Sequence, residues 1–218
     1  MSTWAVLVAA GRGDRLGAER PKAFVRLGDL PLLAESLRRL DRCDPIDGVV
    51  LVVPPEWEQP AILLAEELGA SKVAACVAGG ETRSESVRLG VAEVPDEATV
   101  IVVHDAARPV LPDDVIPRLL EALALGFDGA VPGLPVADTV KRVQDGAVAE
   151  TLVRDELIAV QTPQAFAAAV LRAAVGGEGT DCASLVEAAG GRVAVVPGDE
   201  RLLKVTTSAD LDRVAAWL

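Results

Sequence analysis

At 218 residues, half of them hydrophobic, the chain is long enough to bury one sizeable core, and we expect a single domain over residues 1–218. A net charge of −12, an aromatic content of 3% and the absence of tyrosine argue against nonspecific binding to nucleic acid or anionic membranes and against base-stacking platforms. No run reaches the roughly 18 apolar residues of a membrane span, and the N-terminus lacks a basic, apolar leader, so we expect a cytoplasmic protein.

The first predicted element is a buried strand over residues 4–10, which leads into a glycine-rich loop over residues 9–22. Gly11 and Gly13 let the backbone turn tightly there and present a row of N–H groups, which is an arrangement that binds phosphate. The same loop carries an arginine and a lysine. Glycines for close approach and cations for charge predict a triphosphate site.

Several interpretations of this loop compete. A dinucleotide fingerprint needs a third glycine where Leu16 stands, and the P-loop pattern G-x-x-x-x-G-K-[ST] is absent. A glycine-rich turn without a ligand remains open, although Arg15 and Lys22 count against it. The pattern G-x-G-x-R followed by Pro-Lys resembles the loop of nucleotidyltransferases. In such an enzyme Arg15 and Lys22 would stabilise the α-phosphate and the departing pyrophosphate.

Beyond this loop, apolar strands alternate with helical patterns, which is typical of an α/β domain with a mostly parallel sheet. We expect strands over residues 47–53, 72–77, 99–103, 129–132, 192–196 and 203–205. We expect helices over residues 31–43, 57–69, 82–94, 112–125, 163–175, 180–190 and 208–218, the last of them capped by Ser208.

The alternation breaks in residues 135–162, where two apolar runs flank an Asp-Gly turn and predict an inserted β-hairpin. A two-stranded hairpin is marginally stable alone, so this one needs a surface, either of its own subunit or of another. It carries Thr139 and Arg154, which are candidates, together with Lys204, for holding an anionic co-substrate.

Ligands of open parallel sheets bind beyond the carboxyl ends of the strands. Glycine and polar residues concentrate there in three loops, residues 11–22, 79–86 and 105–109, and we expect these loops to form one site. Asp105 ends a buried strand beside the predicted phosphate cradle. It is the candidate Mg²⁺ ligand, because Mg²⁺ takes one or two carboxylates and completes its shell with phosphate and water oxygens. A salt bridge from Asp105 to Arg108 is the alternative.

The cysteines and the histidine predict no further chemistry. Cys43, Cys76 and Cys182 are widely spaced and form no C-x-x-C, which indicates reduced thiols rather than disulfides or a zinc site. His104 is the one histidine of the chain, so a multi-histidine metal site is excluded, and we expect a structural residue with satisfied hydrogen bonds. No Ser/His/Asp or Cys/His grouping exists. Nucleotidyl transfer needs positioning, a metal and fixed cations instead.

Seven segments, in this order, resemble the 2-C-methyl-D-erythritol 4-phosphate cytidylyltransferase family of non-mevalonate isoprenoid synthesis. They are A-A-G-R-G-D-R-L at 9–16 with P-K at 21–22, G-G-E-T-R-S-E-S-V at 79–87, V-H-D-A-A-R-P at 103–109, P-V-A-D-T-V-K at 135–141, Q-T-P-Q-A-F at 161–166, T-D-C-A-S at 180–184 and K-V-T at 204–206. Two positions depart from the family pattern. Ala23 stands where a glutamine is common, and Cys182 stands where an acidic residue is expected.

The resemblance implies a Rossmann-like, mostly parallel sheet of the nucleotide-diphospho-sugar transferase type and Mg²⁺-assisted transfer of CMP from CTP to methylerythritol phosphate. The residues around the cytosine and ribose would be Ala9, Ala10, Gly11, Gly80, Glu81 and Ser86. Those on the triphosphate would be Gly13, Arg15 and Lys22, with Asp105 joining the nucleotide site as the Mg²⁺ ligand. Those facing methylerythritol phosphate would be Arg108, Thr139, Arg154, Thr162, Thr180 and Lys204. The resemblance also implies a homodimer through residues 135–160, a swapped arm that lends Thr139 and Arg154 to the partner's site.

Two other functions remain open. One is cytidylyl transfer to another polyol phosphate, such as ribitol 5-phosphate, on the same fold. The other is a nucleotide-binding regulatory protein without turnover. Retention of both Arg15 and Lys22 argues against the second, because sensing alone does not require two cations at the transferred phosphate.

Overall fold

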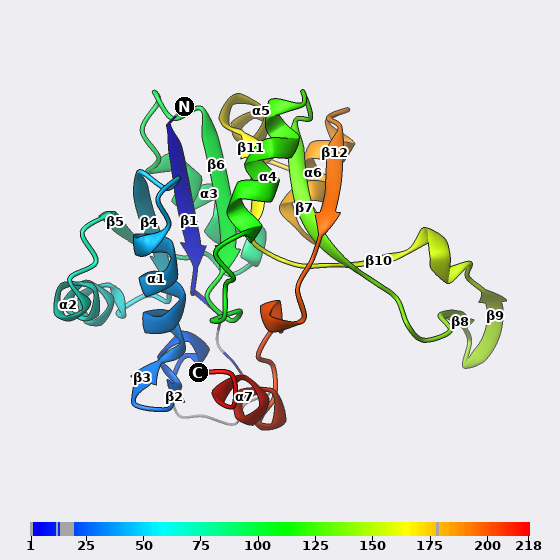
Figure 1. Cartoon of the computed structure of the whole chain (residues 1–218), viewed down its shortest axis with the longest axis horizontal. Coiled ribbons are helices and arrows are strands. Elements are labelled where there is room, and N and C mark those ends of the chain that lie inside the picture. The colour runs from blue at the N-terminus through cyan, green and yellow to red at the C-terminus, as the bar shows by residue number, and fades with distance from the viewer. Residues whose placement is uncertain (1, 12, 14–19, 178) are drawn as a thin grey trace.

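The computed structural model of the chain describes residues 2–11, 13, 20–177 and 179–218. These residues form a central eight-stranded sheet in the order β10-β7-β11-β6-β1-β4-β5, with β12 paired to β7 (Figure 1). Its strands are β1 (Thr3–Val8), β4 (Gly48–Val53), β5 (Val73–Ala78), β6 (Val100–Asp105), β7 (Gly129–Pro135), β10 (Ile158–Val160), β11 (Gln164–Ala167) and β12 (Val193–Pro197). Two small sheets pair β2 (Arg26–Leu27) with β3 (Leu30–Pro31) and β8 (Lys141–Gln144) with β9 (Ala147–Thr151).

The sheet is mostly parallel, as the alternation of elements predicts. β1 runs parallel to β4 and β6, β4 to β5, and β12 to β7. β10 is antiparallel to β7, and β11 is antiparallel to both β6 and β7. This arrangement confirms the expected α/β fold with a mostly parallel sheet.

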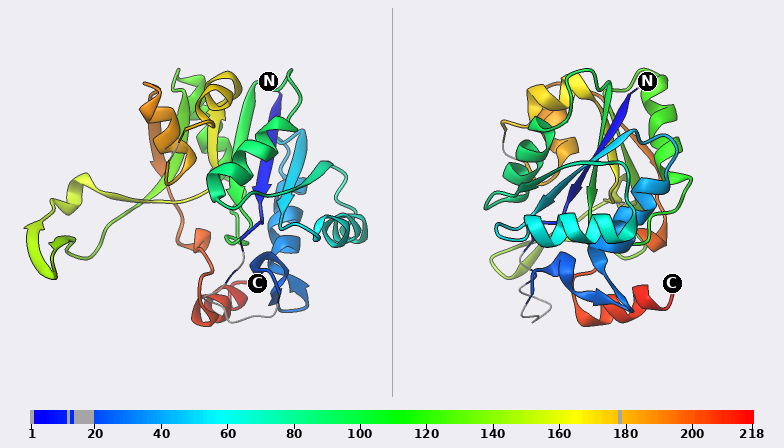
Figure 2. Two further views of the ribbon diagram at one scale, coloured as in Figure 1. Left: turned by 180° about the vertical axis from the view of Figure 1, so that it is seen from behind. Right: turned by 90° about the vertical axis from the view of Figure 1, so that its left-hand side faces the viewer.

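Helices cover both faces of the sheet (Figure 2). They are α1 (Leu32–Arg42), α2 (Glu58–Leu68), α3 (Arg83–Ala92), α4 (Val115–Ala124), α5 (Ala168–Ala174), α6 (Cys182–Ala188) and α7 (Ser208–Ala215). Because successive side chains of a strand point to opposite faces, Leu7 packs with α1, α2 and α4 in one core cluster, and Val6 packs with α3, α5 and α6 in another. None of the described helices has the length and apolarity that crossing a membrane requires.

The segment expected to be one helix over residues 163–175 is instead a strand followed by a short helix. β11 inserts between β6 and β7, and α5 begins only at Ala168. Phe166 is fully buried there, and its ring lies where a Cβ on Gly129 of β7 would clash. Burial in the sheet therefore overrides the helical preference of an alanine-rich sequence.

Three smaller expectations at element ends are also corrected. Residues 203–205 are not a strand; they follow a short 3₁₀ helix, η4 (Glu200–Leu202), as irregular chain. The helix expected over residues 180–190 begins at Cys182, because Asp181 caps it by accepting a hydrogen bond from the Ser184 N–H.

The last helix is capped by Thr207 rather than Ser208. Thr207 keeps an extended backbone, and its hydroxyl accepts a hydrogen bond from the Asp210 N–H. Asp210 reaches back to the Thr207 N–H, which completes a capping box.

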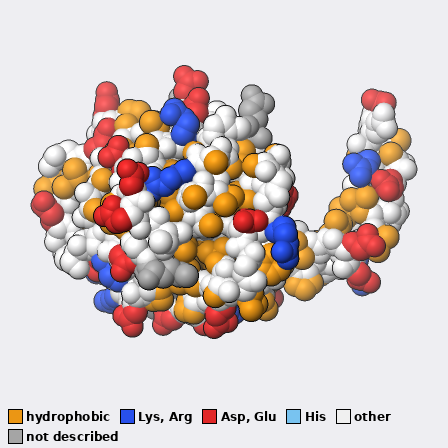
Figure 3. Space-filling view, turned by 90° about the horizontal axis from the view of Figure 1, so that it is seen from above, with side chains coloured by type: hydrophobic (Ala, Val, Ile, Leu, Met, Phe, Trp, Pro, Cys, Tyr) orange, Lys and Arg blue, Asp and Glu red, His pale blue; other side chains and the backbone are white. Residues whose placement is uncertain are grey.

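The expected hairpin is present and projects from the sheet as an arm (Figures 1 and 3). Its strands β8 and β9 meet at an Asp-Gly turn, in which Asp145 has φ 51° and Gly146 has φ 78°. Positive φ at both central residues is the geometry that favours a two-residue hairpin. Every residue of β8 and β9 is exposed, and β10 brings the chain back to the sheet beside β7.

Candidate active site

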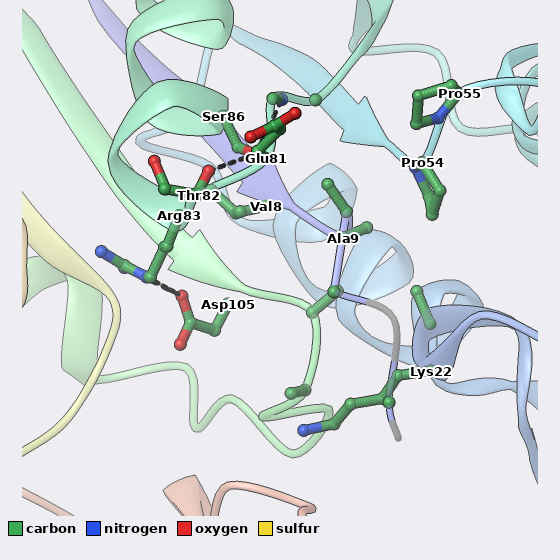
Figure 4. A pocket seen from close by; sticks show the side chains of 18 of the residues that line it. Val8, Ala9, Lys22, Pro54, Pro55, Glu81, Thr82, Arg83, Ser86 and Asp105 are labelled. Atoms are coloured by element: carbon green, nitrogen blue, oxygen red, sulfur yellow. Dashed lines mark hydrogen bonds and ion pairs between the residues drawn. The ribbon is translucent and has the colours of Figure 1, made fainter. Parts of the chain in front are cut away.

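A pocket of about 680 Å³ opens at the carboxyl ends of β1, β5 and β6 (Figure 4). The three loops expected to form one site all line it, and the segment after η4 adds Lys204. The predicted residues on its wall are Ala9, Ala10, Gly11, Gly13, Lys22, Gly80, Glu81, Ser86, Asp105 and Lys204. The geometry therefore brings together the residues expected to hold a nucleotide. Arg15 lies outside the described residues.

The two ends of the first loop come close together where Gly13 lies against Lys22. Gly13 has φ 78°, and a Cβ there would lie 2.7 Å from the Lys22 Cβ. The Lys22 N–H donates a 3.3 Å hydrogen bond to the Gly11 carbonyl. Glycine is thus required where the two ends of the loop meet, and the lysine side chain extends along the pocket toward the side on which Asp105 lies (Figure 4).

Ser86 holds the second loop in shape. Its buried hydroxyl donates to the Thr82 carbonyl at 2.9 Å and accepts from the Gly80 N–H at 3.2 Å. A Cβ on Gly79 would clash with Ala10, so the first and second loops are in direct contact. The Ser86 hydroxyl thus acts as a donor and as an acceptor within the loop, and the loop presents Gly80 to the pocket.

Asp105 is the centre of charge in the pocket. Arg83 approaches its Oδ1 through Nε at 2.9 Å and Nη2 at 2.8 Å, and Lys204 Nζ lies 2.7 Å from its Oδ2. Burial raises the pKa of this carboxyl, but the two cations outweigh burial and hold the pKa well below its usual range. The alternative salt bridge to Arg108 is wrong, because Arg108 Nη1 donates to the Leu202 carbonyl instead.

His104 fixes the turn that follows β6. Its Nε2 bonds to the Arg108 carbonyl at 3.1 Å; because a carbonyl can only accept, Nε2 carries the proton and Nδ1 accepts from the Thr162 hydroxyl at 3.2 Å. The same hydroxyl accepts from the Asp105 N–H at 3.0 Å. Burial lowers the pKa of His104 to about 4, so the ring is neutral. The expectation of a structural histidine is confirmed.

A second pocket of about 570 Å³ adjoins the first and shares three wall residues with it, Arg83, Asp105 and Lys204. The residues expected to face a co-substrate that line it are Arg108, Thr162, Thr180 and Lys204. Thr139 and Arg154 are not on the wall of either pocket within this chain. They lie on the exposed arm, where Arg154 Nη1 donates to the Ala137 carbonyl at 2.6 Å.

Sequence reasoning missed Arg83, the residue that pairs most extensively with Asp105. It stands in the quoted segment at 79–87, as the first residue of α3. One signal for Arg83 was present in the sequence. It directly follows the N-cap of a helix that begins in a loop at the end of a strand, where ligands bind. That position alone does not reveal which of several arginines reaches a carboxylate 22 residues further along the chain.

The donor set around Asp105 fits a magnesium ion that is bound mainly by substrate. Among the described residues, no group of three or more His, Cys, Asp or Glu side chains could hold a metal. Asp105 is ionised, and its two oxygens offer about four acceptor positions, of which the two cations occupy only part. One carboxylate completed by phosphate and water oxygens is a common Mg²⁺ environment.

A family model described as "IspD: 2-C-methyl-D-erythritol 4-phosphate cytidylyltransferase" matches residues 3–218. The protein of that name from Rhodococcus jostii is 45% identical over 95% of this chain and 91% of its own length. The one from Streptomyces coelicolor is 43% identical over 96% of this chain and 82% of its own length.

Solved structures agree with this match. A 4-diphosphocytidyl-2C-methyl-D-erythritol synthase superposes with a TM-score of 0.83 at 34% identity, covering 99% of this chain and 97% of its own. The 2-C-methyl-D-erythritol 4-phosphate cytidylyltransferase from Thermus thermophilus gives a TM-score of 0.79 at 33% identity, covering 97% and 96%. The chain therefore belongs to the 2-C-methyl-D-erythritol 4-phosphate cytidylyltransferase family.

Proposed function

We propose that the protein is an enzyme that transfers CMP from CTP to 2-C-methyl-D-erythritol 4-phosphate, giving CDP-methylerythritol and pyrophosphate. Family membership over nearly the whole chain supports this activity. The observation that carries it is the meeting of two pockets at one charged wall, formed by Arg83, Asp105 and Lys204. One pocket has a glycine loop suited to a triphosphate, and the other has room for a small polyol phosphate.

In this proposal the first pocket holds CTP. The backbone of Gly11 and Gly13 and the side chains of Arg15 and Lys22 bind the triphosphate, while Gly80 and Ser86 define the loop beside the base. A phosphate oxygen of the co-substrate attacks the α-phosphorus in line, a new P–O bond forms, and the bond to the β-phosphate breaks. Lys22 and Arg15 stabilise the charge on the transferred and departing groups, so no protein nucleophile is needed.

Mg²⁺ is the cofactor that we propose, with Asp105 as its ligand from the protein. When bound, the ion neutralises triphosphate charge and orients the α-phosphate. The residues proposed around methylerythritol phosphate are Arg108, Thr162, Thr180 and Lys204. The Thr162 hydroxyl is already engaged by the Asp105 N–H and His104, so its contribution is to fix the wall of this pocket.

The proposal includes a cytoplasmic homodimer of single domains, each spanning residues 1–218. The arm of residues 135–160 would lie on the partner and lend it Thr139 and Arg154. Three exposed apolar side chains support this role, because Val143, Val148 and Val153 are each about 60% exposed in the isolated chain. Apolar surface on a projecting hairpin is suited to burial against a two-fold related copy.

Pyrophosphate release tests the activity. The purified chain is incubated with CTP and Mg²⁺ and with either methylerythritol phosphate or ribitol 5-phosphate, and a chelated reaction serves as the metal control. We expect release with methylerythritol phosphate that is lost on chelation. Preferential use of ribitol 5-phosphate would shift the assignment to another polyol phosphate, and CTP binding without release in any reaction would contradict enzymatic function.

A further inference from the structure

Arg83 lies in the wall that the two pockets share, together with Asp105 and Lys204 (Figure 4 shows the Arg83–Asp105 contact). The two cations bind the carboxylate unequally. Arg83 makes two contacts to Oδ1, at 2.9 and 2.8 Å, whereas Lys204 makes one to Oδ2, at 2.7 Å. The Lys204 side chain is also the more exposed of the two cations, at 40% against 26% for Arg83. Lys204 is therefore the cation that can leave Asp105 at the smaller cost.

The surroundings of Arg83 hold it in place. It is the first residue of α3, directly after the capping box that Thr82 and Glu85 form. Its Nη1 lies 3.9 Å from the Cys182 Sγ, and the neighbouring Ser84 hydroxyl donates to the Gly179 carbonyl at 3.2 Å. Burial raises the pKa of Cys182 to about 11, so the sulfur is a neutral thiol. Within the described part of the chain, Asp105 is thus the anion that forms a salt bridge with Arg83.

Asp105 is only 6% exposed, and a buried carboxylate without a cation is strongly disfavoured. If Lys204 were its sole partner among the described side chains, the lysine could not turn to a substrate phosphate before Mg²⁺ binds without leaving that carboxylate unpaired. We propose that Arg83 is a positioning residue that keeps Asp105 neutralised, so that Lys204 is free to bind the phosphate of the co-substrate. This inference rests on the proposed function and adds a residue to it that acts through Asp105 and Lys204.

A double-mutant cycle tests the inference. In Arg83→Gln, Lys204 is retained by Asp105, and we expect the KM for methylerythritol phosphate to rise by about ten- to a hundredfold, as when a charged hydrogen bond is lost. The KM for CTP should change much less. Lys204→Gln should give a similar rise, because the same phosphate contact is removed. The KM of the double variant should be no worse than that of either single one, since both changes remove one phosphate contact. Its melting temperature should be lower, because Asp105 has then lost both cations.

The conservative variant Arg83→Lys supplies the charge without the two-contact fork, and we expect it to restore part of the co-substrate affinity. Arg172→Gln is the matched control. Arg172 also pairs with a carboxylate, Asp96 at 3.2 Å, and donates to two backbone carbonyls, but it lines neither pocket. Its removal should leave both KM values unchanged. Melting temperatures of all variants report folding, and if Arg83→Gln does not fold, the cycle is run with Arg83→Lys.

Additive effects of the Arg83 and Lys204 changes would overturn the inference, because they would show that Arg83 binds substrate by itself. A wild-type KM in Arg83→Gln would overturn it as well. If the wild-type chain failed to release pyrophosphate, the proposed function would fail separately. Calorimetric titration of the same variants with inorganic phosphate would then read the cycle without turnover, and non-additive losses of affinity would be expected there too.

Discussion

The wall between the two pockets and the arm of residues 135–160 differ in how far this chain alone stabilises them. Asp105 of the wall and the two residues behind it, His104 and Thr162, are all at least 94% buried and are joined by hydrogen bonds, and Arg83 and Lys204 form ion pairs with Asp105. In the arm, every residue of β8 and β9 is exposed, and the ion pair between Arg142 and Glu150 lies in solvent. Exposed pairs of this kind contribute about 0–1 kcal/mol.

The difference indicates that this chain alone preorganises the wall but not the arm. The wall holds its charges in position before any substrate arrives, because the cost of burying them has been met by contacts within one chain. The arm carries residues suited to a phosphate but leaves its own apolar side chains uncovered. We propose that a second copy supplies the surface that covers them.

The largest expected effect comes from breaking the wall at its centre. Asp105→Asn leaves Arg83 and Lys204 beside a neutral amide and removes the proposed magnesium ligand, and we expect kcat/KM to fall by about 10³-fold or more. Pyrophosphate release at saturating Mg²⁺ is the measurement, with the circular dichroism spectrum as the control for folding. Activity close to wild type would show that the carboxylate is not needed for transfer.

The next effect is expected at the edge of the first pocket. Lys22→Ala should lower kcat by roughly 10²-fold, the usual loss of one electrostatic donor to the transition state. Lys22→Arg should recover little, because a planar guanidinium fork does not replace the compact ammonium of lysine. Full recovery by arginine would show that charge alone, without a fixed geometry, suffices there.

Mixing subunits tests whether the arm serves a partner. Lys22→Ala and Arg154→Ala chains should each lose most of their activity, but a dimer containing one of each has one site with both defects and one with neither. We expect subunit exchange to restore up to about half of the wild-type activity per mixed dimer. Exchange demonstrated with two affinity tags, without recovered activity, would mean that the arm completes the site of its own chain.

A smaller effect concerns the pH dependence of the free energy of unfolding. It should arise from His104, which is buried behind the wall, and not from the arm. The pKa of His104 is about 4 in the folded chain against an ordinary value of 6.5, chiefly because of burial. The unfolded state therefore binds more protons between pH 6.5 and 4, and the free energy of unfolding should decrease across this window as pH falls, by roughly 3 kcal/mol.

Glutamine offers a donor group and an acceptor without titrating, so His104→Gln is the comparison variant. Urea unfolding at a series of pH values should show a flatter dependence for the variant between pH 6.5 and 4. The same slope in both proteins would assign the acid sensitivity to other groups.

The strands and the site-forming loops could be predicted because each leaves a local signal. β4 and β6 are fully buried runs dominated by valine, and a buried parallel strand needs little else to be recognised. Gly11 and Gly13 follow such a strand, and so does the Asp-Ala-Ala-Arg-Pro turn after β6. Since parallel strands end at the same edge, the meeting of these loops follows from topology.

The misses have a common physical origin in tertiary contacts. β11 lies in an alanine-rich segment that favours a helix, and it is a strand because it pairs with β6 on one side and β7 on the other. Arg83 is one of seventeen arginines, and its pairing with Asp105 depends on how α3 docks against β1, β4 and β5. The cap at Thr207 rather than Ser208 was decided by which of two adjacent hydroxyl residues stays extended. None of these choices is encoded within a short window of sequence.

Lys204 reaches the site from a segment that is synthesised after every strand of the sheet. The Val205 N–H donates to the Ala107 carbonyl at 2.8 Å, and Arg108 reaches the Leu202 carbonyl, so this segment is fastened directly onto the turn that carries Asp105. The residues after β12 thus supply a cation to both pockets and two hydrogen bonds to the turn that carries Asp105. Cleavage between β12 and η4 would therefore loosen the two pockets together, because they share this attachment.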